Sequence, residues 1–275
     1  MANSDVAVVI LNYMSWQDTL AEIELCHERL HICYSDMIVV DNASPNESAE
    51  ELMKAAKERF VFLKSEENRG YAAGNNIGLR YAYAKGYKYA WILNNDIYFE
   101  DECLLDKILH VFKEDGDVAV VNPDIYAPDG YLYNRDAIRP DFFDYTIGMW
   151  SYRKKGRNVQ DMGGYGYVYR PQGCCMIVDL KKLQQIDFLD EHTFLYVEEP
   201  ILAERLRVKD YKCACCLLTS VVHNHSKTVK KCFASKEVSR MNTQSFSYYL
   251  KTYRGYGKWK TLVCGAFNYV KQLVT

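Results

Sequence analysis

Three polar residues, Asn94-Asn95-Asp96, interrupt the otherwise apolar stretch WILNNDIYFE, residues 91–100. Amides and a carboxylate at the end of a buried strand need partners, because an unpaired buried polar group is costly. A carboxylate in this place can hold Mg²⁺ or Mn²⁺, which prefer oxygen ligands and combine one or two carboxylates with phosphate oxygens. Asp96 is therefore a candidate metal ligand, and Asn94 and Asn95 are candidate donors to ribose or phosphate oxygens. The alternative is that Asp96 is a turn residue that caps the next helix.

A second candidate centre is the pair Glu198-Glu199, which stands directly before Pro200 and the segment ILAERLR. Proline fits the first position of a helix, where its missing N–H costs nothing. The pair would then lie at a helix N-terminus, where the macrodipole favours negative charge. A carboxylate kept ionised there can act as a general base on a hydroxyl, an effect typically worth about 10²–10⁴ in rate. Glu199 is the candidate base, and Glu198 would orient Glu199 or the acceptor. An ordinary acidic helix start is the alternative.

The elements that must position these residues follow an alternating order. Continuous apolar runs predict buried strands near 6–13, 36–41, 61–64, 88–93 and 173–180, and helical spacing predicts helices near 15–30, 49–60, 71–86 and 102–114. Strands that alternate with helices predict an α/β fold, with a mostly parallel sheet between two layers of helices. Residues 124–172, rich in Tyr, Asp, Arg and Gly, break this order and are expected to be a long functional insertion.

Polar clusters follow each of the first four predicted strands. In sheets of this kind the ligand binds beyond the carboxyl ends of the strands. Each cluster alone is weak evidence because turns are normally polar, but four that converge on one edge predict a binding site there. The clusters are Asn12-Tyr13, Asp41-Asn42, Asn68-Arg69-Gly70 and Asn94-Asn95-Asp96.

Several longer segments occur in an order that resembles a known family. They are VVDNASPNES, NRGYAAGNNIGLRYA, WILNND, the block GCCMIVDLKKLQQIDFLDEHTFLYVEEPILAERLRVKDYK, and VVHNH. Together they resemble the inverting glycosyltransferases of family 2, which have a GT-A fold, over about residues 5–228. The resemblance implies a Rossmann-like GT-A domain that transfers a sugar, with inversion, from a UDP- or dTDP-sugar to a saccharide acceptor. A rhamnosyltransferase-like role in bacterial surface polysaccharide synthesis is the setting it favours.

The resemblance also implies roles for individual residues. Asp96 stands where the family has its metal motif and would bind Mn²⁺ or Mg²⁺, with His223 or His225 as a further ligand and Lys227 near phosphate. Asp41 resembles the carboxylate that reads a pyrimidine base edge, although it can also be a turn former. Glu198-Glu199 stands in the acceptor-side block. The residues expected to bind the nucleotide sugar are Asn12, Tyr13, Asp41, Asn42, Asn68, Arg69, Gly70, Asn75, Asn94 and Asn95.

Two departures from the family pattern keep a second function open. The metal motif reads Asn-Asn-Asp, so it offers one carboxylate, and Glu199 replaces the aspartate that often ends the acceptor motif. The alternative is a catalytically weak or inactive protein that binds nucleotide sugars or saccharides on a GT-A fold. A nicotinamide oxidoreductase would need G-x-G-x-x-G after the first strand, where this chain has LNYMSW. A sugar-nucleotide pyrophosphorylase would need a Gly-rich basic loop there.

The C-terminal residues differ from the rest in charge. Residues 225–275 contain ten Lys or Arg and one acid, a charge of +9, whereas the first 224 residues carry −11. Apolar and aromatic residues recur there at helical spacing, from Tyr249 through Trp259 to Val274. We therefore divide the chain into a GT-A domain, 1–228, and a basic amphipathic helical extension, 229–275. The domain itself has a nucleotide-sugar half, 1–123, and an acceptor half, 124–228.

The extension can bind an anionic membrane surface, as a lipid-linked saccharide acceptor would require, or can pack on the core or in a homodimer. The sequence has no apolar run of about 18 residues and no signal peptide is evident, and its ten cysteines are expected to be reduced. A cytoplasmic enzyme, peripheral on the inner face of the plasma membrane, is the localisation these features favour. Nothing in the sequence indicates a nucleic-acid partner.

Overall fold

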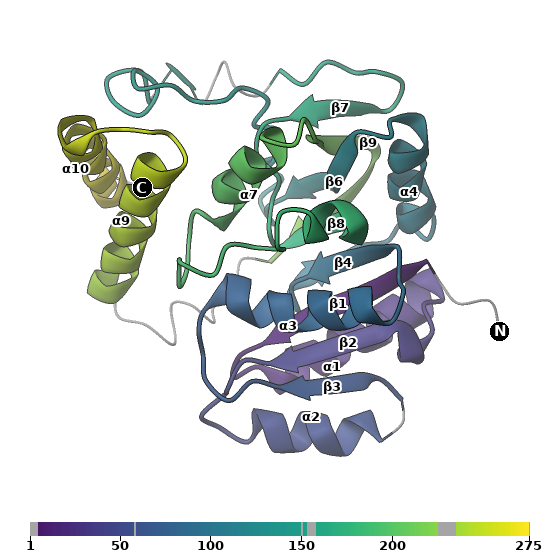
Figure 1. Ribbon diagram of the computed structural model, residues 1–275. Coiled ribbons are helices and arrows are strands. Elements are labelled where there is room, and N and C mark those ends of the chain that lie inside the picture. The colour runs from purple at the N-terminus through teal and green to yellow at the C-terminus, as the bar shows by residue number, and fades with distance from the viewer. Residues whose placement is uncertain (1–4, 58, 150, 153–157, 225–234, 275) are drawn as a thin grey trace.

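The computed structural model describes all residues except 1–4, 58, 150, 153–157, 225–234 and 275, and Figure 1 shows its arrangement. Its described strands form one sheet of nine, in the order β3-β2-β1-β4-β8-β6-β9-β5, with β7 paired to β9. The strands are β1 (Val6–Asn12), β2 (Met37–Asp41), β3 (Val61–Lys64), β4 (Tyr89–Leu93), β5 (Ile97–Tyr98), β6 (Val118–Tyr126), β7 (Tyr165–Val168), β8 (Cys175–Asp179) and β9 (Lys212–His223).

The described helices lie between and after these strands. They are α1 (Trp16–Leu30), α2 (Ser48–Ala56), α3 (Tyr71–Ala84), α4 (Leu104–Glu114), α6 (Leu180–Gln184), α7 (Glu198–Arg207), α9 (Ser235–Thr252) and α10 (Lys258–Val274), with a short 3₁₀ helix, η1 (Tyr34–Asp36). The order of strands and helices agrees with the alternation seen in the sequence.

The first four strands, β3-β2-β1-β4, are all parallel to their neighbours, so their carboxyl ends share one edge. The register pairs Asn12 with Asp41 and Asp41 with Lys64. Strands β1, β2 and β4 are almost entirely buried, as their continuous apolar sequences require. The predicted meeting of the strand-end clusters at one edge is confirmed.

The remaining strands make the sheet mixed. Strand β8 runs antiparallel to both β4 and β6, whereas β6 and β9 are parallel to each other. Strand β6 continues to Tyr126 and β7 lies at 165–168, so the segment expected to be an insertion contributes to the sheet at both its ends. The strands β8, β6 and β9 therefore continue the sheet without interruption beyond the parallel strands β3-β2-β1-β4.

Helices cover both faces of the sheet. One apolar core includes residues of α1, α2 and α4, such as Ile23, Leu52 and Ile108. The core on the other face includes residues of α3, α6 and α7, such as Leu79, Leu183 and Leu206. The α/β sandwich predicted from the sequence is thus present.

The C-terminal helices α9 and α10 form a hairpin beside α7, at one side of the sheet (Figure 1). Phe246, Tyr249 and Leu250 of α9 pack with Ile201 of α7 and Cys264 of α10 in a third apolar cluster. The helical character expected for this part of the chain is confirmed. One face of the hairpin is therefore a packed part of the molecule.

Two global expectations can be compared with the described residues. Among them, no helix combines the length and the apolar character that crossing a bilayer requires. All nine cysteines in the described part of the chain are free, and seven of them are buried. This agrees with their interpretation as small, reduced core residues.

Candidate functional site

Asp96 and His223 are brought together by the pairing of β5 with β9, in which Ile97 lies opposite His223. The Nε2 atom of His223 is 3.1 Å from Oδ1 of Asp96, and both side chains are largely buried. On the other side of the imidazole, the Tyr133 hydroxyl and His223 Nδ1 are 2.6 Å apart. A hydrogen bond to the second ring nitrogen fixes the orientation of a metal-binding histidine, so Tyr133 holds His223 toward Asp96.

The Asp96 carboxylate fits a cation better than it fits a structural role. Both of its oxygens are buried, and neither accepts a well-formed hydrogen bond from the described residues, although His223 is within ion-pair distance. A buried carboxylate without hydrogen bonds is costly unless a charge compensates it. No three acidic, histidine or cysteine side chains come together among the described residues, so the protein offers Asp96 and His223 and leaves room for phosphate oxygens. His225 and Lys227 lie outside the described residues.

The amides that precede Asp96 have internal partners. The Asn95 side chain donates hydrogen bonds to the hydroxyl oxygens of Ser15 (2.9 Å) and Thr19 (2.8 Å) on the α1 side. The backbone N–H of Asn94 donates to the Cys174 carbonyl oxygen at 2.8 Å. These bonds hold the turn after β4 between α1 and β8. They explain why asparagines suit the end of this buried strand, and they fix the backbone that carries Asp96.

A second network joins the ends of β1 and β2. The fully buried Asn12 amide donates to Asp41 Oδ2 at 2.8 Å, and its oxygen accepts from the Thr19 hydroxyl at 2.9 Å. Asp41 also accepts from the backbone N–H (3.0 Å) and the hydroxyl (2.7 Å) of Ser44. In this structure Asp41 therefore shapes the turn at 41–44, the alternative that the sequence left open. Base recognition by Asp41 remains a prediction.

An open cavity of about 450 Å³ adjoins this turn. It lies at the carboxyl ends of β2 and β3, and its volume is typical of small-ligand sites. Half-buried Tyr13 follows β1 on the same edge of the sheet. The residues that line the cavity are Ala43, Ser44, Lys64, Ser65 and Glu66. Sequence reasoning missed these five, although Lys64 ends a predicted strand and the other four follow a predicted strand or its polar cluster.

The start of α3 closes another side of this edge. Asn42 donates to Asn68 Oδ1 (3.0 Å) and to the Gly70 carbonyl oxygen (3.2 Å), which joins the turns after β2 and β3. Asn75 is buried and donates to the Tyr71 carbonyl oxygen at 3.0 Å. The Oδ1 atoms of Asn42 and Asn75 are buried acceptors without a hydrogen-bond partner among the described residues. These acceptors are available to a donor group of a ligand.

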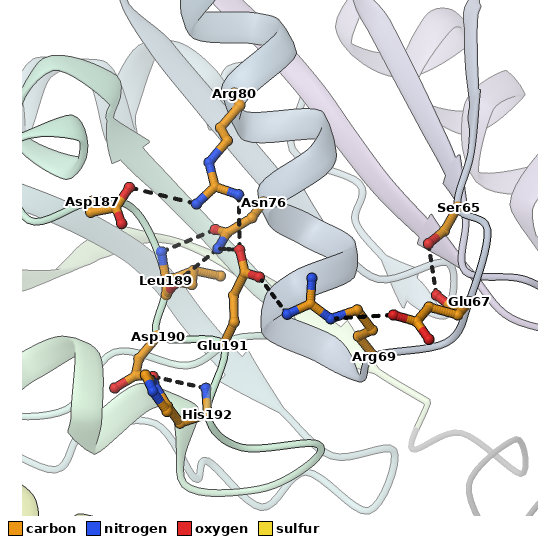
Figure 2. Close-up of polar contacts among 10 residues, drawn as sticks. All are labelled: Ser65, Glu67, Arg69, Asn76, Arg80, Asp187, Leu189, Asp190, Glu191 and His192. Carbon is orange, nitrogen blue, oxygen red and sulfur yellow. Dashed lines mark hydrogen bonds and ion pairs between the residues drawn. The ribbon is translucent and has the colours of Figure 1, made fainter.

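Arg69 is an accessible cation of this region. Its side chain is 57% exposed and makes only long ion pairs, 3.3 Å to Glu191 and 3.7 Å to Glu67 (Figure 2). Exposed ion pairs of this kind contribute little, so Arg69 can exchange them for an anionic ligand at low cost. Glu191 keeps hydrogen bonds from Asn76 and Arg80 in any case. A role for Arg69 at a phosphate or ribose remains a prediction.

The two acceptor-side glutamates begin α7. The helix starts at Glu198, so Pro200 occupies its third position, still within the first turn where its missing N–H costs nothing. Half-buried Glu199 accepts a 3.3 Å hydrogen bond from the Gly173 N–H. The Tyr71 hydroxyl donates to the Gly173 carbonyl oxygen at 2.6 Å and thereby holds the same glycine.

Glu198 and Glu199 have different environments. Burial first, and the charge of Glu199 second, raise the pKa of Glu198 to about 8. Glu198 thus carries a proton at neutral pH, and its Oε1 atom has no hydrogen-bond partner in the described structure. Two neighbouring carboxyls with unlike environments are a common arrangement for separate acid–base roles. The pair therefore combines the buried carboxyl of Glu198 with the half-buried Glu199, which faces the Gly173 N–H.

Glu22 of α1 is a buried acid that sequence reasoning missed. Burial, and then the nearby Asp96 charge, raise its pKa well above the usual range. The sequence did contain a signal, because the spacing of Thr19, Glu22, Ile23 and Cys26 puts them on one face of a helix. The structure buries this whole face. Glu22 is thus a second buried carboxyl beside Asp96.

The fold and this edge define a class of protein. A parallel half-sheet, a cavity at its carboxyl edge, a buried carboxylate–imidazole pair and an acidic helix start suit an α/β enzyme that binds a phosphorylated ligand. The chain belongs to glycosyl transferase family 2, because the family model matches residues 7–179. It is therefore a glycosyltransferase by family, and the resemblance seen in the sequence is confirmed at that level.

Individual relatives agree with this assignment. The chain is 25% identical, over 222 residues, to the low-salt glycan biosynthesis hexosyltransferase Agl10 of Haloferax volcanii, and the match covers 80% of this chain and 67% of that protein. The fold is similar to that of the mannosyltransferase PcManGT from Pyrobaculum calidifontis in complex with GDP-Man and Mn²⁺. That match has a TM-score of 0.60 at 12% identity and covers 98% and 76% of the two chains.

A second solved structure supports the same fold. It is S. aureus TarS residues 1–349 in complex with UDP-GlcNAc, with a TM-score of 0.58 at 10% identity and coverage of 97% and 72% of the two chains. The GT-A fold expected from the sequence is confirmed by these matches.

Proposed function

We propose that this family member is an inverting, metal-assisted hexosyltransferase of glycan synthesis. It would move a sugar from a nucleoside-diphosphate donor to a saccharide acceptor, with Glu199 as general base. The observation that carries the proposal is the buried Asp96 carboxylate, which faces His223 and accepts no hydrogen bond from the described residues, at the edge where the sheet gathers its polar groups. The name of the Haloferax volcanii relative supports the hexosyl part of the proposal.

The donor would lie along the carboxyl edge of β1 to β4. The cavity beside Ser44 and Lys64 would take the nucleoside, and the exposed Arg69 would meet a phosphate or ribose oxygen. Asp96 and His223 would hold a divalent cation between the protein and the diphosphate. When bound, the cation supplies Lewis-acid stabilisation of the negative charge that develops on the leaving diphosphate.

The transfer step needs one proton acceptor. An acceptor hydroxyl oxygen attacks the anomeric carbon of the donor sugar, and the bond from that carbon to the diphosphate oxygen breaks. Glu199 takes the hydroxyl proton, and attack from the side opposite the leaving group inverts the anomeric centre. Glu198, already protonated at neutral pH because burial raises its pKa to about 8, does not compete for that proton and can donate a hydrogen bond.

A thermal-shift panel with and without Mn²⁺ tests donor binding, with UDP-glucose, UDP-GlcNAc, GDP-mannose and dTDP-rhamnose as probes. A ligand that binds the folded state raises the unfolding temperature by mass action. We expect a UDP- or dTDP-sugar to do so more strongly with Mn²⁺ than with chelator. A panel in which no nucleotide sugar shifts the transition would contradict the donor assignment, and a response to dTDP-rhamnose alone would identify a rhamnosyltransferase.

The second candidate function is a nucleotide-sugar-binding protein without turnover. Two observations favour it. The Asn-Asn-Asp motif offers a single carboxylate, Asp96, and the Asn95 amide is already hydrogen-bonded to Ser15 and Thr19. Donor hydrolysis separates the two candidates. Release of nucleoside diphosphate in Mn²⁺ supports the enzyme, and tight donor binding without release supports the binding protein.

For the acceptor, we propose a lipid-linked saccharide at an anionic membrane surface. The outer face of α10 exposes an apolar stripe in which Trp259 is 68% and Leu262 73% exposed, followed by Tyr269 and Val270. Exposed Lys258 and Lys260 flank it, and the sequence has no acid after Glu237. A basic helix with such a face suits anionic lipid headgroups. The enzyme would then work at the inner face of the plasma membrane.

Vesicle co-sedimentation tests this placement. The Trp259→Ser, Leu262→Ser double variant should lose binding to vesicles of phosphatidylglycerol and phosphatidylcholine, while Met53→Ser, on exposed α2, keeps it. If the double variant still binds the vesicles, the proposed membrane-binding role of α10 is contradicted. The same role is contradicted if the wild-type protein does not bind vesicles but forms a dimer, and the double variant is a monomer.

A further inference from the structure

The segment that leads into the two glutamates, residues 189–197, is held in an unusual conformation. Tyr196 and Val197, directly before Glu198, both have left-handed backbone angles, with φ of 72° and 70°. This region is unfavourable for residues other than glycine, and for a β-branched valine in particular. Such strain persists only where the surroundings impose it. The contacts of the segment should therefore show what imposes it.

On one side the segment is fixed by α3 (Figure 2). Asn76 makes a two-way hydrogen bond with the Leu189 backbone, 2.8 Å to its carbonyl oxygen and 3.0 Å from its N–H. The Tyr71 N–H donates to the Phe194 carbonyl oxygen at 2.9 Å. Gly70, at φ 93°, lies so close that a Cβ atom there would be 1.9 Å from the same oxygen. The start of α3, on the donor side, thus touches the segment directly.

On the other side the segment is fixed by α9. The Ser245 hydroxyl donates to the Leu195 carbonyl oxygen at 2.8 Å. The nearly buried Asp190 carboxylate accepts from the hydroxyls of Tyr248 (2.9 Å) and Tyr253. Leu195 is the residue directly before the strained pair. Helix α9 therefore holds the segment at both its ends, from the side away from the sheet.

Helix α9 is itself anchored to α7 and the sheet by a buried polar cluster. Arg139 makes a two-pronged ion pair with Glu204 of α7, at 2.7 and 2.8 Å. The Tyr169 hydroxyl donates to Glu204 at 2.7 Å and also contacts the Tyr249 hydroxyl of α9 at 2.8 Å. Arg254, 5% exposed, donates to the Tyr249 hydroxyl at 2.9 Å. This cluster gives α9 a fixed position relative to the helix that begins with Glu198.

We propose that α9, together with Tyr253 directly after it, is a positioning element of the acceptor site, in which Ser245 and Tyr253 hold the strained segment that sets Glu199 in place. The inference rests on the proposed function, because it assigns Glu199 the role of base. This positioning role divides the C-terminal helices by function. Helix α9 belongs to the catalytic edge, and the outer face of α10 is the part that a partner can bind. Neither Ser245 nor Tyr253 touches the reacting atoms in this account.

The test compares the Ser245→Ala, Tyr253→Phe double variant with Thr243→Ala. Thr243 is the matched control, because it is an exposed α9 residue whose hydroxyl bonds only within its own helix, to the Ser239 carbonyl oxygen at 2.8 Å. We expect the double variant to lose roughly 10–100-fold in kcat with an unchanged KM for the donor, since small displacements of a catalytic group have effects of this size. Ser245→Thr, which keeps a hydroxyl, should restore most of the loss that Ser245→Ala causes.

Hydrogen exchange supplies a readout that needs no turnover. In the double variant, the amides of residues 194–199 should exchange faster than in wild type, while the amides of α3 exchange at the wild-type rate. In the Thr243→Ala variant, all of these amides should exchange at the wild-type rate. Unchanged exchange there, or a kcat equal to that of wild type, would overturn the positioning role. If the wild-type protein has no transferase activity, the proposed function fails, and faster exchange at 194–199 would still support α9 as the element that holds the segment.

Discussion

The ends of β1 and β2 and the start of α7 differ in how their buried polar groups are paired. At the ends of β1 and β2, Asn12 and Asp41 are saturated by hydrogen bonds to each other, to Thr19 and to Ser44. At the start of α7, the Oε1 atom of buried Glu198 has no hydrogen-bond partner among the described residues, and the two residues before it are held in left-handed conformations. The Asp96 carboxylate likewise accepts no hydrogen bond from the described residues.

The difference separates scaffold from chemistry. Groups whose hydrogen bonds are complete hold neighbouring elements together, and replacing them should cost stability. Groups left without partners are those that a ligand, a cation or a proton must complete, and replacing them should cost activity and change the pH dependence. Substitutions at both kinds of group test whether saturated groups act on stability and unsaturated groups act on activity.

Glu199→Gln should have the largest effect. The amide keeps the shape of the side chain but cannot accept the hydroxyl proton, so turnover should fall by about 10²–10⁴ while the donor still raises the unfolding temperature. Transfer to acceptor and thermal shift are the two measurements. Glu28→Gln, on the exposed side of α1, is the control. Wild-type turnover in Glu199→Gln would show that Glu199 is not the general base.

Asp96→Asn should abolish the metal dependence of donor binding. Affinity for the nucleotide sugar in Mn²⁺ should then equal affinity in chelator, as measured by calorimetry. Tyr133→Phe should be milder and lower Mn²⁺ affinity by about 10–100-fold, since it removes the hydrogen bond that orients His223. Metal-enhanced binding that survives in Asp96→Asn would place the cation elsewhere.

The pH dependence of stability should reveal the buried acid Glu198. Its pKa is about 8 when folded against an ordinary value of 4.5, so the folded state holds the proton more tightly than the unfolded state. The free energy of unfolding should therefore decrease as pH rises from about 4.5 through 8. Urea unfolding of Glu198→Gln should show a smaller decrease across this window. Parallel curves for the two proteins would mean that Glu198 is ionised in the folded state.

Asn12→Ala should act on stability. It removes one hydrogen bond each from buried Asp41 and Thr19, which keep their bonds to Ser44 and Asn95, and this loss costs about 1–3 kcal/mol in the free energy of unfolding. Glu50→Ala, at an exposed position of α2, should change it by no more than about 0.5 kcal/mol. Equal effects of the two substitutions in urea unfolding would show that the Asn12 network is not a scaffold.

Much of the fold and part of the site could be predicted from the sequence. Continuous apolar strands and the polar clusters that follow them are local signals, and they located the edge where Asp96, Asp41 and Asn42 gather. The histidines after β9 were identified as candidates, but the pairing of His223 with Asp96 depends on β5 and β9, which are more than 120 residues apart.

The rest depends on contacts between distant segments. The amides of Asn12 and Asn95 were expected to meet a ligand, and their partners Thr19 and Ser15 follow only from the packing of α1 against the sheet. Likewise, no local pattern shows that Gly70 must lie against the Phe194 carbonyl, or that Ser245 reaches Leu195. The basic composition of the tail drew attention to a surface, whereas the docking of α9 depends on side chains spread over three helices.

The most direct test of the central claim is anomalous diffraction from Mn²⁺ in crystals soaked with a nucleoside-diphosphate sugar. We expect one strong peak between the Asp96 carboxylate and the His223 imidazole, with the diphosphate bound to the manganese and the sugar directed toward Glu199. A manganese peak or a nucleotide bound away from the carboxyl edge of β1 to β4 would contradict it.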